Sequence, residues 1–197
     1  MSCRKDAPQQ RRRPLSRLAI VALLLLMVGS ALPASAQGTG FSLGLLGGVG
    51  GSPDSEEYTG TSFQFFAAWE WKLRTLAQLR VGQLDLDLST DAEGVDVGAD
   101  LTWIALSTEY RYHVDYYDAG YIIGIGFYSL ETDAVFVPGV GVIGANDEDT
   151  VGLHLGVSGQ FKLGNRLSIP VEIMGHYADF DAAQVFITAQ AGLAIRF

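Results

Sequence analysis

The sequence predicts an all-β protein: an eight-stranded antiparallel up-and-down transmembrane β-barrel that follows a cleaved N-terminal signal peptide. Three observations support this prediction. The chain begins with an export leader, eight later segments carry apolar residues at every second position, and the connections between them alternate between short and long. A period of two residues is typical of strands, and no stretch sustains the longer period of an amphipathic helix.

Residues 1–36 are expected to be the signal peptide. Basic residues precede an apolar run at 18–28, and the small residues Ala34 and Ala36 follow it in the pattern that signal peptidase cleaves. The run is shorter than the roughly 20 residues of a membrane-spanning helix, which argues against the alternative of a retained anchor. Residues 37–197 are therefore the expected barrel domain. Because Cys3 is the only cysteine, this domain is predicted to have no disulfide, thiol nucleophile or thiolate metal site.

Eight segments show the strand pattern in order along the chain. They are residues 41–45, 63–71, 77–82, 104–112, 121–127, 151–162, 167–176 and 185–197. The last is the clearest, because apolar residues hold every second position from Val185 to Phe197 while small or polar residues lie between them. An oily face and a small or polar face therefore run along each strand.

Two positions break the pattern. In the third strand, Leu84 and Leu86 follow Leu79 and Val81 in the opposite phase, which predicts a β-bulge near Gly82. In the seventh strand, Pro170 removes a ladder hydrogen bond. A bulge there, or a strand that begins late, is the expected consequence.

The connections predict a molecule with two unlike ends. Tight links lie at 72–74, 113–118 and 164–166, whereas longer polar loops lie near 51–60, 88–98, 130–149 and 177–184. Short turns alternating with long loops are typical of membrane barrels, and an even strand number places both termini at the short-turn end. The third long loop contains much apolar sequence between 134 and 143, which predicts either a β-ribbon or a lid over the barrel mouth.

The regular face is apolar and aromatic, so it is expected to contact lipid, because exposing it to water would favour aggregation. The opposite face carries charges that a narrow lumen tolerates only if they are paired. We expect these charges to form a network that plugs the lumen; a gate that passes ions is the alternative. The members of this lumenal network are Glu70, Arg80, Glu109, Arg111, Lys162, Glu172 and Arg196.

Charge separates the two ends. The leader holds six of the 13 basic and one of the 22 acidic residues, so the rest of the chain has a net charge of −14. This acidity argues against nucleic-acid partners. Lys72, Arg74 and Arg166 lie at the short turns. The acidic residues of the long loops are Asp54, Glu56, Glu57, Asp91, Glu93, Asp96, Glu131, Asp133, Asp147, Glu148, Asp149, Asp179 and Asp181.

The signal peptide, the eight alternating strands and a closing strand that ends in Phe197 resemble the small outer-membrane barrels of the OmpA, OmpX and OmpW type. The resemblance rests on architecture and covers residues 37–197. It implies a location in the bacterial outer membrane, with lipid and lipopolysaccharide around the barrel. It also implies recognition of Leu193, Ile195 and Phe197 by the barrel-assembly machinery, and escort by periplasmic chaperones. We expect a monomer.

The leading functional hypothesis is a non-enzymatic barrel that supports the envelope or presents its acidic loops. A narrow channel or conduit for ions or small hydrophobic molecules is the alternative, and a lipid-A-modifying enzyme is a third. No catalytic residue is predicted, because His154 and Ser158 are separated by roughly 13 Å along one strand. No cofactor or metal site is predicted either, because the acidic loops lack EF-hand spacing. Diffuse bridging by calcium or magnesium to lipopolysaccharide phosphates is the alternative for these loops.

Overall fold

A computed structural model of the chain describes residues 40–53, 60–89, 96–114, 117–137, 141–143, 145–181 and 183–197. The predicted signal peptide and its cleavage site at Ala34 and Ala36 lie outside these residues. Among the described residues, no helix is long and apolar enough to cross a bilayer.

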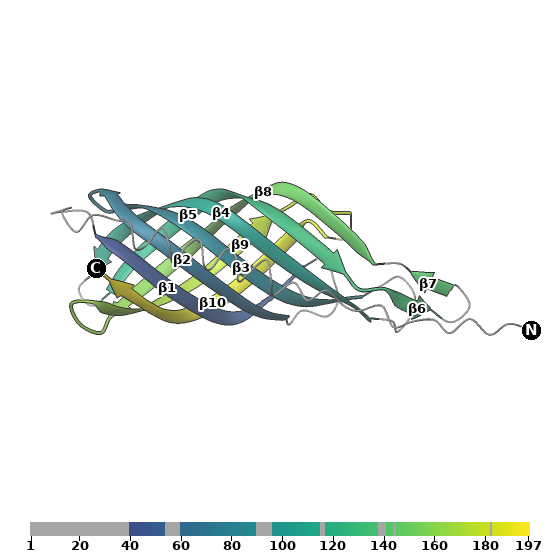
Figure 1. Cartoon of the computed structure of the whole chain (residues 1–197). Coiled ribbons are helices and arrows are strands. Elements are labelled where there is room, and N and C mark those ends of the chain that lie inside the picture. The colour runs from purple at the N-terminus through teal and green to yellow at the C-terminus, as the bar shows by residue number, and fades with distance from the viewer. Residues whose placement is uncertain are drawn as a thin grey trace, which may run out of the picture. The chain divides into compact units, whose positions relative to one another are not determined.

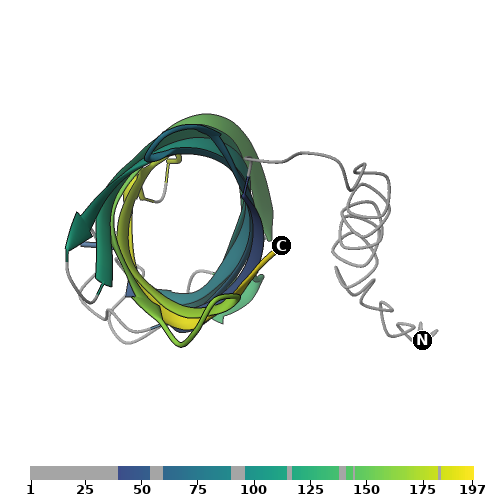
Figure 2. The same cartoon turned by 90° about the vertical axis from the view of Figure 1, so that its left-hand side faces the viewer.

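Eight strands form a closed barrel, which confirms the predicted fold class (Figures 1 and 2). Each strand pairs antiparallel with the next, and the last pairs back with the first through Leu45 and Leu193. The barrel strands are β1 (Phe41–Gly51), β2 (Gly60–Lys72), β3 (Thr75–Ser89), β4 (Asp96–Val114), β5 (Tyr117–Thr132), β8 (Asn146–Lys162), β9 (Leu167–Tyr177) and β10 (Val185–Arg196).

The outer face of the barrel is an apolar belt. Residues at every second position of each strand leave their side chains exposed, as the alternation predicted. Members of the belt from different strands include Leu45, Phe63, Leu106, Ile125, Phe127, Leu155, Ile173, Ile187 and Leu193. So large an exposed apolar surface is stable only where lipid covers it.

Aromatic side chains gather toward the short-turn end of the belt. Tyr110 stacks on Tyr121 with ring centroids 5.5 Å apart, and Tyr112 contacts both rings. Phe197 lies beside Phe41, and its backbone N–H donates to the Phe41 carbonyl at 2.8 Å. This grouping matches the interfacial girdle expected of a membrane barrel.

The prediction of a bulge near Gly82 is wrong. β3 pairs without a shift from Thr75 to Ser89 on its β4 side, so Leu84 and Leu86 point into the lumen. The apolar residues of β3 switch from the outer face to the inner face at this level because the lumen itself becomes apolar there. A register shift occurs in β2 instead, between Glu70 and Lys72.

The two consequences expected of Pro170 are also not found. β9 begins at Leu167, three residues before the proline. β9 pairs with β10 at Ser168–Ala194 and at Val171–Ala191, so the register is the same on both sides of Pro170. The ladder simply lacks its pairs at Ile169 and Pro170, which a strand held on both flanks tolerates.

The apolar part of the third long loop forms a β-ribbon, one of the two predicted arrangements. β6 (Val135–Val137) pairs with β7 (Gly141–Ile143), and Figure 1 shows this ribbon beyond the ends of β5 and β8. The segment that folds over the barrel mouth comes from the fourth long loop, between β9 and β10. Ala178, Phe180 and Ala183 of that segment are buried.

Candidate functional site

The lumen holds the charged residues that the sequence singled out, so it is the candidate functional site. Its centre is the ion pair between Arg80 of β3 and Glu172 of β9, with 2.6 Å between Arg80 Nη1 and Glu172 Oε2. Both side chains are at most 3% exposed. β3 and β9 lie four places apart in the ring of eight strands, so this pair crosses the lumen from wall to wall.

A second buried pair lies nearer the short turns. Arg111 donates from Nε to Glu109 Oε1 at 2.8 Å and from Nη2 to Glu109 Oε2 at 2.9 Å, a two-point contact within β4. Gln78 joins the two pairs, because its amide nitrogen donates to Glu109 and its amide oxygen accepts from Arg80. Such two-point contacts between arginine and a carboxylate are among the stronger hydrogen bonds in proteins.

The remaining predicted residues lie at the rim of the short-turn end. Arg196 contacts Glu70 at 3.2 Å, and Lys162 contacts Asp118 at 3.0 Å. Arg196 and Lys162 are 59% and 47% exposed, so these pairs are solvated and contribute little to stability. The predicted single network is therefore two linked buried pairs with separate rim pairs below them.

Uncharged residues of the network were missed by the sequence reasoning. Gln64 donates to Glu172 at 3.4 Å and accepts from the Trp103 indole at 3.3 Å, and Ser158 donates to Glu109 at 2.6 Å. Both lie in the inward phase of their strands, which was the available signal. Among the described residues, Gln190 Oε1 is the buried side-chain oxygen or nitrogen that lacks a partner. So complete a set of hydrogen bonds is what a structural polar core needs.

A second polar cluster surrounds two buried histidines. His154 Nε2 hydrogen-bonds Ser107 Oγ at 2.7 Å, and the Tyr128 hydroxyl lies 3.3 Å from His154 Nδ1 and 3.2 Å from His176 Nδ1. The Trp103 ring packs on His176 with centroids 4.8 Å apart. These contacts join four strands and mark the level at which the lumen changes from polar to apolar.

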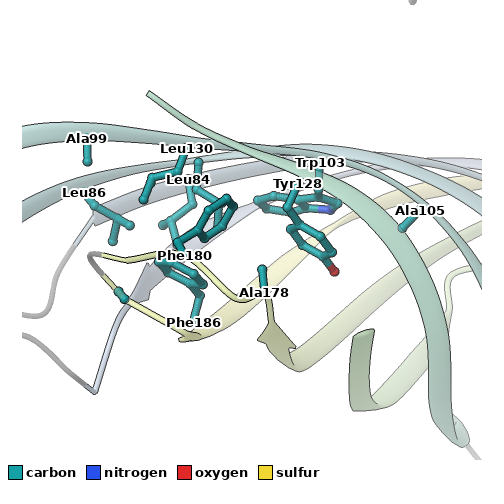
Figure 3. Close-up of a cluster of buried hydrophobic side chains, with 12 residues drawn as sticks. Leu84, Leu86, Ala99, Trp103, Ala105, Tyr128, Leu130, Ala178, Phe180 and Phe186 are labelled. Carbon is teal, nitrogen blue, oxygen red and sulfur yellow. The ribbon is translucent and has the colours of Figure 1, made fainter. Parts of the chain in front are cut away.

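Above this level the lumen is filled by hydrocarbon. Figure 3 shows Phe180 and Phe186 grouped with Leu84 and Leu130 at the long-loop end of the barrel. Phe180 comes from the segment after β9 and contacts Phe186 edge to face, with centroids 6.1 Å apart. The members of this apolar plug are Leu84, Leu86, Ala99, Leu101, Trp103, Ala105, Tyr128, Leu130, Ala178, Phe180, Ala183 and Phe186.

At the opposite end the lumen opens into a vestibule of about 350 Å³. Arg111, Lys162 and Arg196 line its wall, and Arg74 and Arg166 line it from the turns. The ring of ribbons looks open in Figure 2, but the side chains of the two buried pairs and of the apolar plug fill it beyond the vestibule.

The residues considered for catalysis do not come together. Ser158 bonds Glu109, and Glu172 bonds Arg80, so neither contacts His154. His154 instead pairs with Ser107, and the neighbour of its other ring nitrogen is the Tyr128 hydroxyl and not a carboxylate. In the described part of the chain, no group of three or more His, Cys, Asp or Glu side chains is placed to hold a metal ion.

Leu193, Ile195 and Phe197 project from the outer face of β10 and are exposed. They pair with β1 at the barrel seam, where Leu43 faces Ile195. Their role as an assembly signal stays a prediction.

Comparison with solved structures identifies the class of protein. The barrel resembles a major outer membrane protein from Thermus thermophilus, with a TM-score of 0.61, 13% identity, and coverage of 82% of this chain and 100% of the other. It also resembles Neisserial surface protein A (NspA), with a TM-score of 0.59, 12% identity, and coverage of 82% and 98%. Ail, the attachment invasion locus protein of Yersinia pestis, matches with a TM-score of 0.51, 14% identity, and coverage of 81% and 97%.

These neighbours show that the chain has the fold of the bacterial outer-membrane β-barrels, and the apolar belt suits that fold to a lipid bilayer. More particularly, it has the fold of the small eight-stranded members, which confirms the resemblance in fold that the sequence predicted. No family model matches the sequence, and no curated protein matches it.

Proposed function

We propose that the protein is a non-enzymatic, non-conducting barrel that supports the outer membrane and presents an acidic surface at its long-loop end. The observation that carries this proposal is the filled lumen. The Arg80–Glu172 pair and the buried cluster around Phe66 occupy one half, and the apolar plug around Phe180 occupies the other. With the interior occupied, the surfaces that remain for function are the belt, the loops and the rims.

The long-loop end is the side we assign to the cell exterior, as in barrels with long extracellular loops and short periplasmic turns. Except for Arg80 in the lumen, each lysine and arginine after residue 40 lies at or beside a short turn. The described acidic residues toward the long-loop end include Asp85, Asp100, Glu131, Asp133, Asp147, Glu148, Asp149, Asp179 and Asp181. Such a surface attracts cationic groups and repels anionic ones.

This charge separates the proposed surface role from that of one structural neighbour. Ail has been crystallised in complex with the heparin analogue sucrose octasulfate, a polyanion. An acidic outer end is unsuited to a sulfated glycan, so we propose basic protein segments as its partners. Divalent cations that bridge the carboxylates to lipopolysaccharide phosphates are the second class of contact.

Conductance in planar bilayers tests the proposal. The purified protein is expected to give no steady conductance, because the apolar plug blocks a water path through the lumen. The matched variants are Glu109→Gln in the polar half and Phe180→Ala in the apolar half. Steady openings of the wild-type protein that change in the Glu109→Gln variant would overturn the proposal and favour a gated channel.

The gated narrow channel remains the second candidate because one observation favours it. A continuous chain of hydrogen bonds runs from Arg111 in the vestibule through Glu109, Gln78, Arg80 and Glu172 to Gln64. Rearrangement of these partners could admit water to the polar half. The apolar plug would also have to move, which a conductance that appears only in the Phe180→Ala variant would reveal.

We also propose that the barrel-assembly machinery reads the end of β10 and that periplasmic chaperones deliver the chain. The support is the exposed apolar series Leu193, Ile195 and Phe197 on the closing strand. Phe197→Ala should lower the amount of folded barrel in outer membranes, measured as the heat-sensitive band on gels. Phe127→Ala, an equally lipid-facing change away from the terminus, is the control and should have less effect.

A further inference from the structure

The vestibule at the short-turn end concentrates the positive charge of an otherwise acidic chain. Residues from 37 onward include seven lysines and arginines against 21 acidic residues. Five of those seven line this one cavity, and among the described residues the carboxylates that line it are those of Glu70 and Asp118. A cavity with walls of one charge focuses its field and raises the local concentration of counter-ions.

Three of the five cations have a carboxylate partner. Arg111 pairs with Glu109, which lies deeper in the lumen than the cavity, Lys162 pairs with Asp118, and Arg196 pairs with Glu70. Arg74 and Arg166 have no ion-pair carboxylate among the described residues, and both are exposed. Within the described part of the chain, two positive charges at the mouth of the vestibule therefore have no carboxylate counter-ion.

The orientation of the wall residues indicates a soluble ligand. Arg111, Lys162 and Arg196 lie in the inward phase of β4, β8 and β10, the phase of the buried residues Glu109, His154 and Ala194. Their head groups therefore face the lumen and not the surrounding lipid. Lys72, the last residue of β2, lies two residues before Arg74 and does not line the cavity.

Size and donor chemistry narrow the class of ligand. A cavity of about 350 Å³ is at the lower end of the range for small-molecule sites, and too small for a folded partner. Guanidinium groups offer forked pairs of N–H donors that match the oxygens of phosphates and carboxylates. The neighbouring His113, Gln160 and Ser168 provide further polar groups around the cavity.

We propose that the vestibule binds a small multivalent oxyanion, phosphorylated or carboxylated, from the compartment that the short turns face. Arg74 and Arg166 supply the free charge, while the paired cations of the wall orient the ligand. This site is separate from the acidic long-loop end and does not depend on whether the lumen conducts.

Titration calorimetry of the intact mature protein in phosphatidylcholine vesicles tests the proposal. Inorganic pyrophosphate and citrate are the two probes, used at low ionic strength. Either anion should bind at a single site, more weakly as salt is added, and the stronger of the two identifies the class of ligand. The double variant Arg74→Gln with Arg166→Gln should bind at least about tenfold more weakly, or about 1.4 kcal/mol.

Lys72→Gln is the matched control, because it removes a positive charge beside the same turn and outside the cavity. It should retain binding within about twofold, a change of less than about 0.4 kcal/mol on the same scale. The heat-sensitive gel band verifies that each variant is folded. Absence of binding of both anions to the wild-type protein would overturn the proposal, as would equal weakening in the Lys72→Gln control.

Discussion

The two halves of the lumen are held together by different interactions. Toward the short turns, buried charges and amides satisfy one another, with Arg80–Glu172 as the central pair. Toward the long loops, leucines and phenylalanines pack around Trp103 and Tyr128. Each half excludes water. In the polar half, removing one partner leaves the other charge buried and unpaired, which costs much stability. In the apolar half, the loss of stability grows with the volume of the side chain removed.

The lumen is therefore closed by two successive layers of side chains, one polar and one apolar. A lumen closed only by ion pairs can open when the partners exchange. A plug of hydrocarbon has no such alternative arrangement, so its presence above the polar half favours a permanently closed interior. Substitutions in the two halves are therefore expected to lower the free energy of unfolding in different ways.

The largest effect is expected from Arg80→Met, which leaves Glu172 buried without its cation. An uncompensated buried charge costs about 3–5 kcal/mol, measured as the free energy of unfolding in urea from lipid vesicles. The double variant Arg80→Met with Glu172→Leu should recover most of this loss, because it removes the pair together. If the double variant is as unstable as the single one, the polar half is not held by pairing.

A smaller loss is expected from Phe180→Ala in the apolar half. Truncating a buried phenylalanine costs about 3 kcal/mol, through lost contacts and the cavity that remains. Phe180→Leu, which keeps most of the volume, should cost less than about 1.5 kcal/mol in the same unfolding assay. Unchanged stability in Phe180→Ala would show that the segment after β9 does not seal the mouth.

The smallest loss of stability is expected from a substitution at the histidine cluster, which forms the boundary between the two halves of the lumen. Ser107→Ala removes the partner of His154 Nε2 and should lower the free energy of unfolding by about 1–2 kcal/mol, the cost of a buried polar group left unpaired. Thr108→Ala, on the outer face of the same strand, should change it by less than about 0.5 kcal/mol. Equal effects of the two substitutions would show that the hydrogen bonds of the histidine cluster do not stabilise the barrel.

The sequence predicted the walls of the barrel better than its contents. Local alternation determines which side of a strand faces lipid, so the strands, their phases and the lumenal charges were predictable. Partner choice was not, because Arg80 and Glu172 meet across the full width of the lumen from strands that do not pair. That contact depends on the closed geometry and not on any local pattern.

The apolar plug was missed for a related reason. Leu84 and Leu86 are out of phase with the lipid-facing residues of β3, and a bulge was predicted because apolar residues were expected to face lipid. Both leucines point into the lumen, which is apolar at this level. Phe180 packs there from the connection between β9 and β10, which the sequence predicted to be a polar loop. Gln64 and Gln78 carry no charge, so the pattern of charged residues did not identify them, although their amides complete the same network.

The closed lumen is tested most directly by thiol accessibility, since Cys3 is the only cysteine in the chain and lies in the predicted leader. Ala105 pairs with Arg80 in the ladder, faces the lumen and is 2% exposed, whereas Lys162 lines the open vestibule. With a charged, membrane-impermeant thiol reagent, Lys162→Cys should be labelled rapidly, and Ala105→Cys should stay unlabelled until the barrel is unfolded. Labelling of folded Ala105→Cys at a rate near that of Lys162→Cys would contradict a sealed interior.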